Sequence, residues 1–200
     1  MTTTTVPLFP LRTVLFPGGP LPLRVFEPRY LDMVSRCMKA DKPFGVLLLP
    51  QGGDTDREVS LPMSSTGTLA TIADWYQGND GLLGLTALGG CRFRLLDSRR
   101  EADGLNIGEV EMLEPEPRFR LPSTYSLMAG LLKALLEDLG LLYENIDKHY
   151  DDASWVSYRY AEVLPLELEE KQRCLEMTDP LERLAFLRPL LRGIREQQTQ

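Results

Sequence analysis

The sequence predicts an α+β protein in which a small antiparallel β barrel with one inserted helix is followed by a bundle of helices. Three observations predict this. Short β-branched and aromatic segments with turn signals occupy the first part, leucines at helical spacing occupy the rest, and 11 of the 15 prolines precede Arg118. Short strands between turns are typical of barrels, whereas 3.6-residue spacing is typical of helices. We therefore expect two domains, residues 1–118 and residues 119–200.

The predicted strands are short and are separated by prolines and glycines. Extended segments within residues 6–16 are interrupted by prolines, which suit sheet edges and bends. Residues 44–49 are apolar and end at Pro50, and residues 67–76 are rich in β-branched and aromatic side chains. The sequence GNDG at 78–81 predicts a hairpin turn into residues 82–88.

Two further segments complete the predicted barrel. In residues 91–95, apolar and basic side chains alternate, which predicts a buried face of Cys91, Phe93 and Leu95 and a solvated face of Arg92 and Arg94. Residues 105–113 form the last strand, with Gly108 expected at a β-bulge. Five or six short strands are enough for a closed or nearly closed barrel.

The inserted helix is expected within residues 26–40. Pro28 suits the first turn of a helix, where a missing N–H does no harm. Apolar side chains then recur at helical spacing, at Tyr30, Val34, Cys37 and Met38. Acidic residues early and basic residues late agree with the helix dipole.

The second domain is expected to contain four helices. They cover residues 127–139, 155–164 and 167–177 and the segment from Pro180 onward. Gly140 is placed to cap the first of them, and Asp179 is placed to cap the last. Pro189 is expected to kink or end the last helix early.

Composition and charge exclude several classes of protein. The formal net charge is −7 and the pI is near 4.9, with acidic residues in excess in both halves, which disfavours binding to polyanions. No apolar stretch approaches the ~20 residues that a membrane-spanning helix needs. The first five residues lack the basic start and apolar core of a signal peptide, so we expect a cytoplasmic protein.

No arrangement of residues points to catalysis, a metal or a cofactor. The three cysteines are far apart and are expected to be small core residues, and His149 is the only histidine. His149 acting as a base for a cysteine nucleophile is a less favoured alternative to a solvated loop residue. The acids of residues 54–58 lie in an expected exposed loop and lack the spacing of an EF-hand. The phosphate loop GxxxxGK[ST] is absent from the 200 residues.

Several motifs carry a resemblance to a known family. They are VPLFPLR at 6–12, LFPG at 15–18 and LPLRVFEPRY at 21–30, followed by FGV at 44–46, GT at 67–68, DG at 80–81, CRFR at 91–94, GEV at 108–110, LPL at 164–166 and EEK at 169–171. Together they closely resemble the Lon protease N-terminal domain family, over nearly the whole chain. The chain looks like a stand-alone, bacterial-type member without the ATPase and Ser-Lys peptidase modules.

The resemblance implies a PUA-like β barrel followed by a helical bundle, the part of Lon (peptidase S16 family) proteases that recognises substrates. We expect a non-catalytic module that binds unfolded or flexible protein segments, with an adaptor role in proteolysis as one form of that function. An enzyme is not expected.

The most distinctive signature residues lie in one segment and allow two interpretations. They are Arg24, Phe26, Glu27, Pro28, Arg29 and Tyr30. One interpretation is a patch that contacts a partner. The favoured one is architectural: Glu27 bonds free N–H groups of the helix, Arg29 pairs across the barrel mouth and Tyr30 packs in the core.

Trp75 and Tyr76 are the candidate peptide-binding residues. They end a predicted strand just before the hairpin turn. Exposed aromatic rings there could anchor a flexible peptide, since they supply contact area at low entropy cost. Burial of at least one ring in the core is the open alternative.

The alternative function is RNA binding by the PUA-like barrel. Arg92, Arg94, Arg99 and Arg100 form a small basic ladder. Acids at Asp97, Glu101 and Asp103 interrupt it, and the acidic pI opposes the electrostatic contribution on which such binding depends. We therefore disfavour this alternative.

Overall fold

The computed structural model describes residues 3–49, 65–78 and 80–198. These residues divide into two compact units, Met1–Pro115 and Glu116–Gln200, which we call the β unit and the helical unit. The division lies three residues before the domain boundary predicted from the proline distribution. The expected loop at 51–58, with its acids at 54–58, lies outside the described residues.

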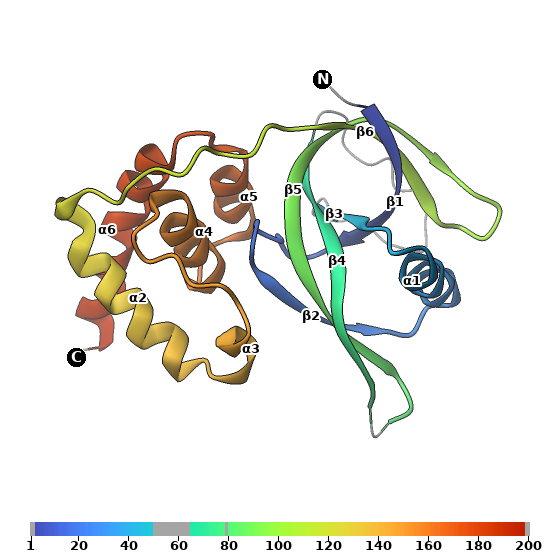
Figure 1. Ribbon diagram of the computed structural model, residues 1–200, viewed down its shortest axis with the longest axis horizontal. Helices are drawn as coiled ribbons and strands as arrows, with labels where there is room; N and C mark the ends of the chain where they lie inside the picture. Colours follow the sequence, from blue (N-terminus) through green and yellow to red (C-terminus); the bar gives the residue numbers. More distant parts are fainter. Residues whose placement is uncertain (1–2, 50–64, 79, 199–200) are drawn as a thin grey trace. The chain divides into compact units, whose positions relative to one another are not determined.

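The β unit contains one six-stranded sheet with a helix inserted after its second strand (Figure 1). Its elements are β1 (Thr3–Leu11), β2 (Pro20–Val25), α1 (Pro28–Ala40), β3 (Phe44–Leu48), β4 (Thr66–Gln77), β5 (Leu83–Arg100) and β6 (Asn106–Met112). The strand order is β2-β5-β4-β3-β1-β6, and β5 also pairs with β6.

The sheet is mixed, so the prediction of an antiparallel sheet was wrong for one pair of strands. β1 and β3 run parallel, with Leu8 opposite Gly45 and Leu11 opposite Leu48, and the other pairs are antiparallel. Parallel neighbours need a long crossover connection. Here β2 and α1 supply that connection, which the short spacing of the apolar segments did not reveal.

Strand β2 was not predicted as a separate strand. It begins at Pro20 and contains Pro22, both of which lack the N–H that a central strand needs. The strand nevertheless forms because it lies at one end of the strand order and pairs only with β5. Prolines are tolerated at such an edge.

A β-bulge changes which side chains of β5 are buried. Thr68 pairs with Arg92 and Ala70 pairs with Gly89, so Gly90 and Cys91 lie opposite the single residue Leu69. The extra residue shifts the alternation. Cys91 is therefore exposed, which corrects that prediction, whereas Phe93 and Leu95 are buried as predicted. Arg92 pairs in register with Thr68 and is buried, which corrects the prediction that it is solvated.

Gly108 is required for close packing and not for the predicted bulge. It pairs in register with Val6 and with Ser98, and the register shift between β5 and β6 lies on β5, between Leu95 and Asp97. A Cβ atom at Gly108 would lie 2.8 Å from Leu8 Cδ1 and 2.9 Å from Leu95 Cδ1. The glycine thus allows side chains from two strands to pack over β6.

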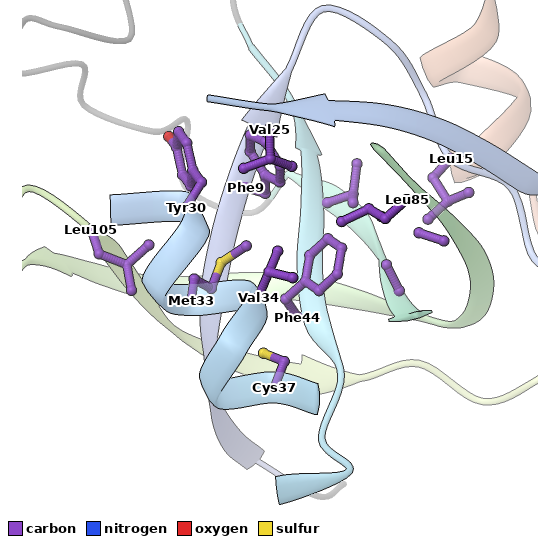
Figure 2. Packing of buried hydrophobic residues seen from close by; sticks show 13 residues of the cluster. Phe9, Leu15, Val25, Tyr30, Met33, Val34, Cys37, Phe44, Leu85 and Leu105 are labelled. Carbon is purple, nitrogen blue, oxygen red and sulfur yellow. The ribbon is translucent and has the colours of Figure 1, made fainter. Parts of the chain in front are cut away.

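The core of the β unit is apolar and forms where α1 packs on the sheet. Figure 2 shows Tyr30, Met33, Val34 and Cys37 on the face of α1 that lies toward Phe44 and its neighbours. The rings of Phe9 and Tyr30 stack with centroids 4.1 Å apart. A second cluster includes Leu8, Phe93 and Leu95. Burial of these side chains supplies the main favourable free energy of this unit.

The helical unit contains the four predicted helices and two short helical segments, η1 and α3, that were not predicted. Its elements are η1 (Ser123–Tyr125), α2 (Ser126–Asp138), α3 (Leu141–Glu144), α4 (Ala153–Val163), α5 (Leu168–Glu176) and α6 (Pro180–Gln198). Asp179 caps α6 as predicted, since its Oδ1 accepts a hydrogen bond from the Leu181 N–H at 2.7 Å. Pro189 does not end α6. None of the described helices is long and apolar enough to cross a membrane.

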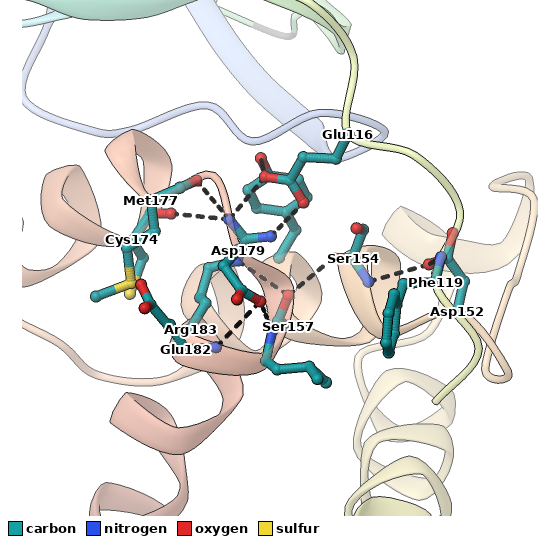
Figure 3. A network of polar contacts seen from close by, with 12 residues as sticks. Glu116, Phe119, Asp152, Ser154, Ser157, Cys174, Met177, Asp179, Glu182 and Arg183 are labelled. Carbon is teal, nitrogen blue, oxygen red and sulfur yellow. Dashed lines mark hydrogen bonds and ion pairs between the residues drawn. The ribbon is translucent and has the colours of Figure 1, made fainter. Parts of the chain in front are cut away.

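Two buried arginines hold the helical unit together. Arg183 is fully buried and makes a bidentate pair with Glu116, at 2.7 Å from Nη2 and 3.0 Å from Nη1 (Figure 3). Its Nε donates to Ser157 Oγ at 2.9 Å, and its guanidinium lies 3.7 Å from the centre of the Tyr158 ring. The guanidinium therefore joins α4, α6 and the segment before η1 through polar contacts.

Arg159 forms the second buried ion pair, on α4. It is fully buried and lies 3.1 Å from Glu162, whose other oxygen accepts a hydrogen bond from Tyr143 at 2.5 Å. Burial raises the pKa of Glu162, and Arg159, Tyr143 and Lys171 only partly oppose that effect. Lys171 donates to the Glu162 carbonyl oxygen at 2.8 Å, which attaches α5 to the end of α4.

Candidate functional site

The signature segment is divided between the core and the surface. Tyr30 is buried against Phe9, as the architectural interpretation expects. Arg29 is also buried, donates to Glu27 at 2.5 Å and to the Gly104 carbonyl oxygen at 3.2 Å, and lies over the Tyr30 ring. Arg29 thereby ties the start of α1 to the loop between β5 and β6.

Glu27 does not bond to the free N–H groups of α1, which corrects the prediction for this residue. It occupies the N-cap position, and Pro28 follows as the first helical residue. The Glu27 side chain makes no cap hydrogen bond because its carboxylate accepts the hydrogen bond from Arg29 instead. Its role is to hold Arg29 in place.

Arg24 and Phe26 face solvent, in contrast to their neighbours. Arg24 forms an ion pair with Asp80 at the tip of the β4–β5 hairpin. Phe26 directly follows β2 and is 64% exposed, whereas Val25 between them is buried. Alternation along an extended chain therefore places Phe26 on the same side as Arg24.

Trp75 and Tyr76 are both exposed, by 57% and 55%, but the structure does not bring them together. Trp75 pairs with Leu85, and Tyr76 pairs with Gly84. Successive strand residues point to opposite faces. A bulge at Ala73 sets this arrangement, because it directs Trp75 to the face of the core residue Leu85 and Tyr76 to the outer face.

The outer face of the hairpin carries Tyr76, Gly84 and Arg24 in one row across β4, β5 and β2. The Tyr76 ring lies on Gly84, where a Cβ atom would come within 2.3 Å of Cζ. A shallow cavity of about 370 Å³ opens beside this row, and its lining includes Leu82 and the Arg24–Asp80 pair. The ring and the adjacent cation are available to a partner on this face.

The inner face of the hairpin has a smaller cleft between α1 and β4. It encloses about 180 Å³ and is lined by Trp75 together with Met38, Asp41, Lys42, Ile72 and Asp74, among others. We call it the Trp75 cleft. Met38 is partly exposed here, which corrects the prediction that it joins the buried stripe of α1. At about 100° per residue, Met38 lies at the margin of the stripe that Tyr30, Val34 and Cys37 define.

Another cavity of the β unit lies behind α1. It encloses about 400 Å³ and is bordered by Thr5, Met33, Arg36 and Ile107. Arg36 at its edge lies 3.7 Å from Asp103. The lining is mainly apolar and no aromatic ring contributes to it, so we interpret it as loose packing between the helix and the strands.

Three of the four arginines of the predicted basic ladder are buried or paired with an acid. Arg92 is buried, Arg94 pairs with Glu111 at 3.4 Å and Arg99 pairs with Glu101 at 3.8 Å. A nucleic-acid surface needs basic side chains that are free to neutralise phosphates. The geometry does not favour the RNA alternative.

The cysteines and the histidine show no arrangement typical of catalysis. Burial raises the pKa of the Cys37 thiol, and it raises that of Cys174 to about 11, so both are protonated at neutral pH. His149 lies edge-on to Trp155, with ring centroids 6.4 Å apart. Within residues 3–49, 65–78 and 80–198, no group of three or more His, Cys, Asp or Glu side chains could hold a metal ion.

Trp75 and Tyr76 stay candidates from the sequence, whereas the residues that surround them could not be predicted from it. Met38, Asp41 and Asp74 meet Trp75 only because α1 packs beside β4 and because Ala73 is bulged. Asp74 precedes Trp75 directly, and this was the one local signal that could have linked an acid to the ring.

Comparison with solved structures identifies the class of fold. The chain is 38% identical to the structure described as "Crystal Structure of Lon N-terminal domain protein from Xanthomonas campestris", with a TM-score of 0.74, and 92% of this chain and 96% of that chain are covered. The N-terminal domain of Mycobacterium avium complex Lon protease shares the fold at 18% identity, with a TM-score of 0.59 and the same coverage. The mixed sheet with helices is therefore a Lon N-terminal domain fold, and it is consistent with a PUA-like unit.

The chain belongs to the ATP-dependent protease La (LON) substrate-binding domain family, whose model matches residues 5–193. The match accounts for almost all of the 200 residues, and no ATPase or peptidase domain is present in them. Membership of this family supports substrate binding as the general function.

Curated relatives match along different lengths of the chain. Lon protease of Xanthomonas oryzae is 27% identical over 196 residues, which is 94% of this chain and 23% of that protein. Protein cereblon of Gallus gallus is 29% identical over 122 residues, which is 60% of this chain and 26% of that protein. The chain thus spans about a quarter of the length of these relatives.

Proposed function

We propose that this chain binds flexible or unfolded protein segments through the tip of the β4–β5 hairpin and presents them for proteolysis as an adaptor. The observation that carries the proposal is the exposure of Trp75 and Tyr76 near the tip of the β4–β5 hairpin. Large aromatic side chains are usually buried, and exposed ones are enriched where proteins contact partners. Family membership supports a substrate-binding role for such a surface.

The two rings would contact a segment from opposite sides of the hairpin. Phe26 and Tyr76 supply apolar area on the outer face, and Trp75 with Met38 supplies it on the inner face. Each face offers a small apolar area, so the gross gain of about 25 cal/mol per Å² is modest. Ordering a flexible segment offsets much of this gain, and we expect weak, micromolar affinity.

We also propose that the sheet closes into a barrel that keeps the hairpin rigid and that the helices form a bundle. The support for closure is that pairing runs from β5 through β4, β3, β1 and β6 and returns to β5. Within the hairpin, β5 is paired on both sides, with β4 and with the edge strand β2, which limits its bending. The aromatic rings would then be held in fixed positions, which lowers the entropy cost of binding.

Fluorescence anisotropy with a labelled, permanently unfolded model protein tests the proposal. We expect Trp75→Ala and Tyr76→Ala each to weaken binding at least about fivefold, as expected for exposed aromatic anchors. Leu141→Ala is the matched control, because Leu141 is 84% exposed and lies in the helical unit. Equal affinity of the wild type, Trp75→Ala and Tyr76→Ala would contradict the proposal.

The adaptor role needs a separate measurement. Degradation of a labelled unfolded substrate by a Lon protease is measured with and without this chain. The proposal predicts faster degradation with the wild type and no acceleration with Trp75→Ala. No change in rate with the wild type would remove the adaptor role and leave substrate binding.

A further inference from the structure

We propose that the Trp75 cleft selects substrate segments in which a lysine or arginine lies next to apolar residues. This inference rests on the proposed function, and it names the chemistry that the inner face of the hairpin recognises. The cleft combines an exposed aromatic ring, a partly exposed methionine and two carboxylates.

The size of the cleft suits one side chain. It encloses about 180 Å³, whereas pockets for small-molecule ligands usually enclose roughly 300–1,000 Å³. Trp75, Met38 and Ile72 supply apolar walls. An aliphatic chain with a polar end fits such a site, because its methylene groups contact the walls while its charged end stays at the rim.

The charges around the cleft favour a cation. Asp41 and Asp74 both line it, and neither carboxylate has an ion-pair partner among the residues that the structure describes. Asp74 Oδ1 accepts a hydrogen bond from the Trp75 N–H at 2.8 Å. Lys42 is the one cation in the described lining, so the acids are in excess. The C-terminal end of α1, which Asp41 follows, adds partial negative charge.

The Trp75 ring adds a second attraction for the same ligand. Cations lie favourably over the face of an indole ring, and Trp is the best of the aromatic side chains in this respect. Trp75 is 57% exposed, so its ring is accessible from solvent. An uncharged side chain would make the same apolar contacts without the electrostatic attraction. An acidic side chain would be repelled by the two carboxylates.

Asp41 has a left-handed backbone conformation at the end of α1. Its backbone has φ 49° and ψ 48°, the left-handed region that favours glycine at the end of a helix. Glycine would end α1 with less strain. Replacing Asp41 by glycine therefore removes the carboxylate while favouring the native backbone, so the variant is expected to fold.

Three labelled peptides with one apolar sequence test the inference, with lysine, norleucine or glutamate at the central position. Anisotropy at low salt should give about fivefold tighter binding of the lysine peptide than of the norleucine peptide, with the glutamate peptide weakest. In Asp41→Gly combined with Asp74→Asn, the lysine preference should fall below about twofold while the norleucine peptide binds as before. Asp32→Asn is the control, since Asp32 is an exposed aspartate of α1 that does not line the cleft.

Each outcome decides between the two proposals. Binding of all three peptides with equal affinity, or a lysine preference that survives both neutralising substitutions, would overturn the inference and leave the proposed function intact. No binding of any peptide to the wild type would overturn the proposed function as well. A lysine preference that weakens as salt rises from 50 to 500 mM would support the electrostatic origin.

Discussion

The β unit and the helical unit are stabilised by different kinds of buried contact. In the β unit, α1 packs on the sheet through apolar side chains such as Met33, Val34 and Phe44 (Figure 2). In the helical unit, Arg159 and Arg183 are fully buried, and each is paired with a glutamate (Figure 3 shows the pair of Arg183). Apolar burial is insensitive to protonation, whereas a buried ion pair depends on both partners being charged.

This difference decides which substitutions each unit should tolerate. Shape and volume decide the packing of the β unit, so similar apolar side chains can replace one another at modest cost. A buried guanidinium needs hydrogen-bond acceptors at fixed positions, and Arg183 has Glu116, Ser157 and the Met177 carbonyl oxygen. The helical unit should therefore tolerate single substitutions at these positions poorly.

The largest expected effect is that of Arg183→Met. It leaves the Glu116 carboxylate buried without its cation, which should lower the free energy of unfolding of the helical unit by about 3–5 kcal/mol. Urea unfolding at pH 7 measures it. In a Trp75→Phe background, Trp155 is the one remaining tryptophan and reports on this unit.

The matched control is the double variant Glu116→Met and Arg183→Met. Replacing both partners by apolar side chains leaves no unpaired charge and should recover most of the loss. A single variant that costs less than about 1 kcal/mol would mean that the ion pair does not hold the unit together.

A smaller loss is expected from Met33→Ala in the β unit. Met33 is buried between α1 and the sheet, and truncation should cost about 3 kcal/mol through lost apolar contact and a cavity. The loss of stability is measured by NMR, from the peak intensities of β3 amides during a urea titration. The cost should be the same at pH 4 and pH 7, and a cost that changes with pH would break the contrast between the two units.

The contribution of the Glu116–Arg183 pair to the free energy of unfolding should depend on pH, unlike the contribution of Met33. Burial alone would raise the pKa of Glu116, but hydrogen bonds and charge from Arg183, with help from Tyr158 and Ser154, lower it below its ordinary value of 4.5. A carboxyl with a lowered pKa in the folded state contributes stability above the unfolded value, and that contribution is lost as pH falls through the folded value.

The stability difference between wild type and the double methionine variant isolates this contribution. It should be constant above pH 4.5 and should shrink as pH falls below it. Glu162 is present in both proteins, so its raised pKa, which acts in the opposite direction, cancels. A difference that grows on acidification would contradict the lowered pKa.

The smallest effect on stability is expected from Gly84→Val on the hairpin. The new Cβ would meet the Tyr76 ring and displace it, at a cost of about 1 kcal/mol because the ring is half exposed. The tyrosine ring resonances in NMR spectra should shift. Gly90→Ala is the control, since a Cβ there meets no atom closer than 3.5 Å, and an equal shift in both variants would remove the proposed contact.

The elements with strong local signals could be predicted from the sequence. The helix at 26–40 and the hairpin turn at 78–81 follow from proline and glycine positions and from apolar spacing, and the structure has α1 and the β4–β5 hairpin there. The parallel pairing of β1 with β3 could not be predicted, because it depends on a crossover between distant segments.

The candidate site could be predicted only in part, and β-bulges are the reason. Strict alternation would place Trp75 on the outer face and Tyr76 on the core face, and one extra residue at Ala73 reverses this. A second bulge, at Gly90 and Cys91, places Cys91 at the surface instead of in the core. Such one-residue shifts leave little trace in composition or periodicity, yet they decide which side chains a partner can reach.

The most direct test of the central claim is a chemical-shift map of the whole chain. Amide spectra are recorded while an unlabelled, permanently unfolded protein is added. The account predicts shifts at residues 72–78 and 80–85 and at Phe26 and Met38, with the helical unit unchanged. Shifts confined to the helical unit, or no shifts at saturating concentration, would contradict it.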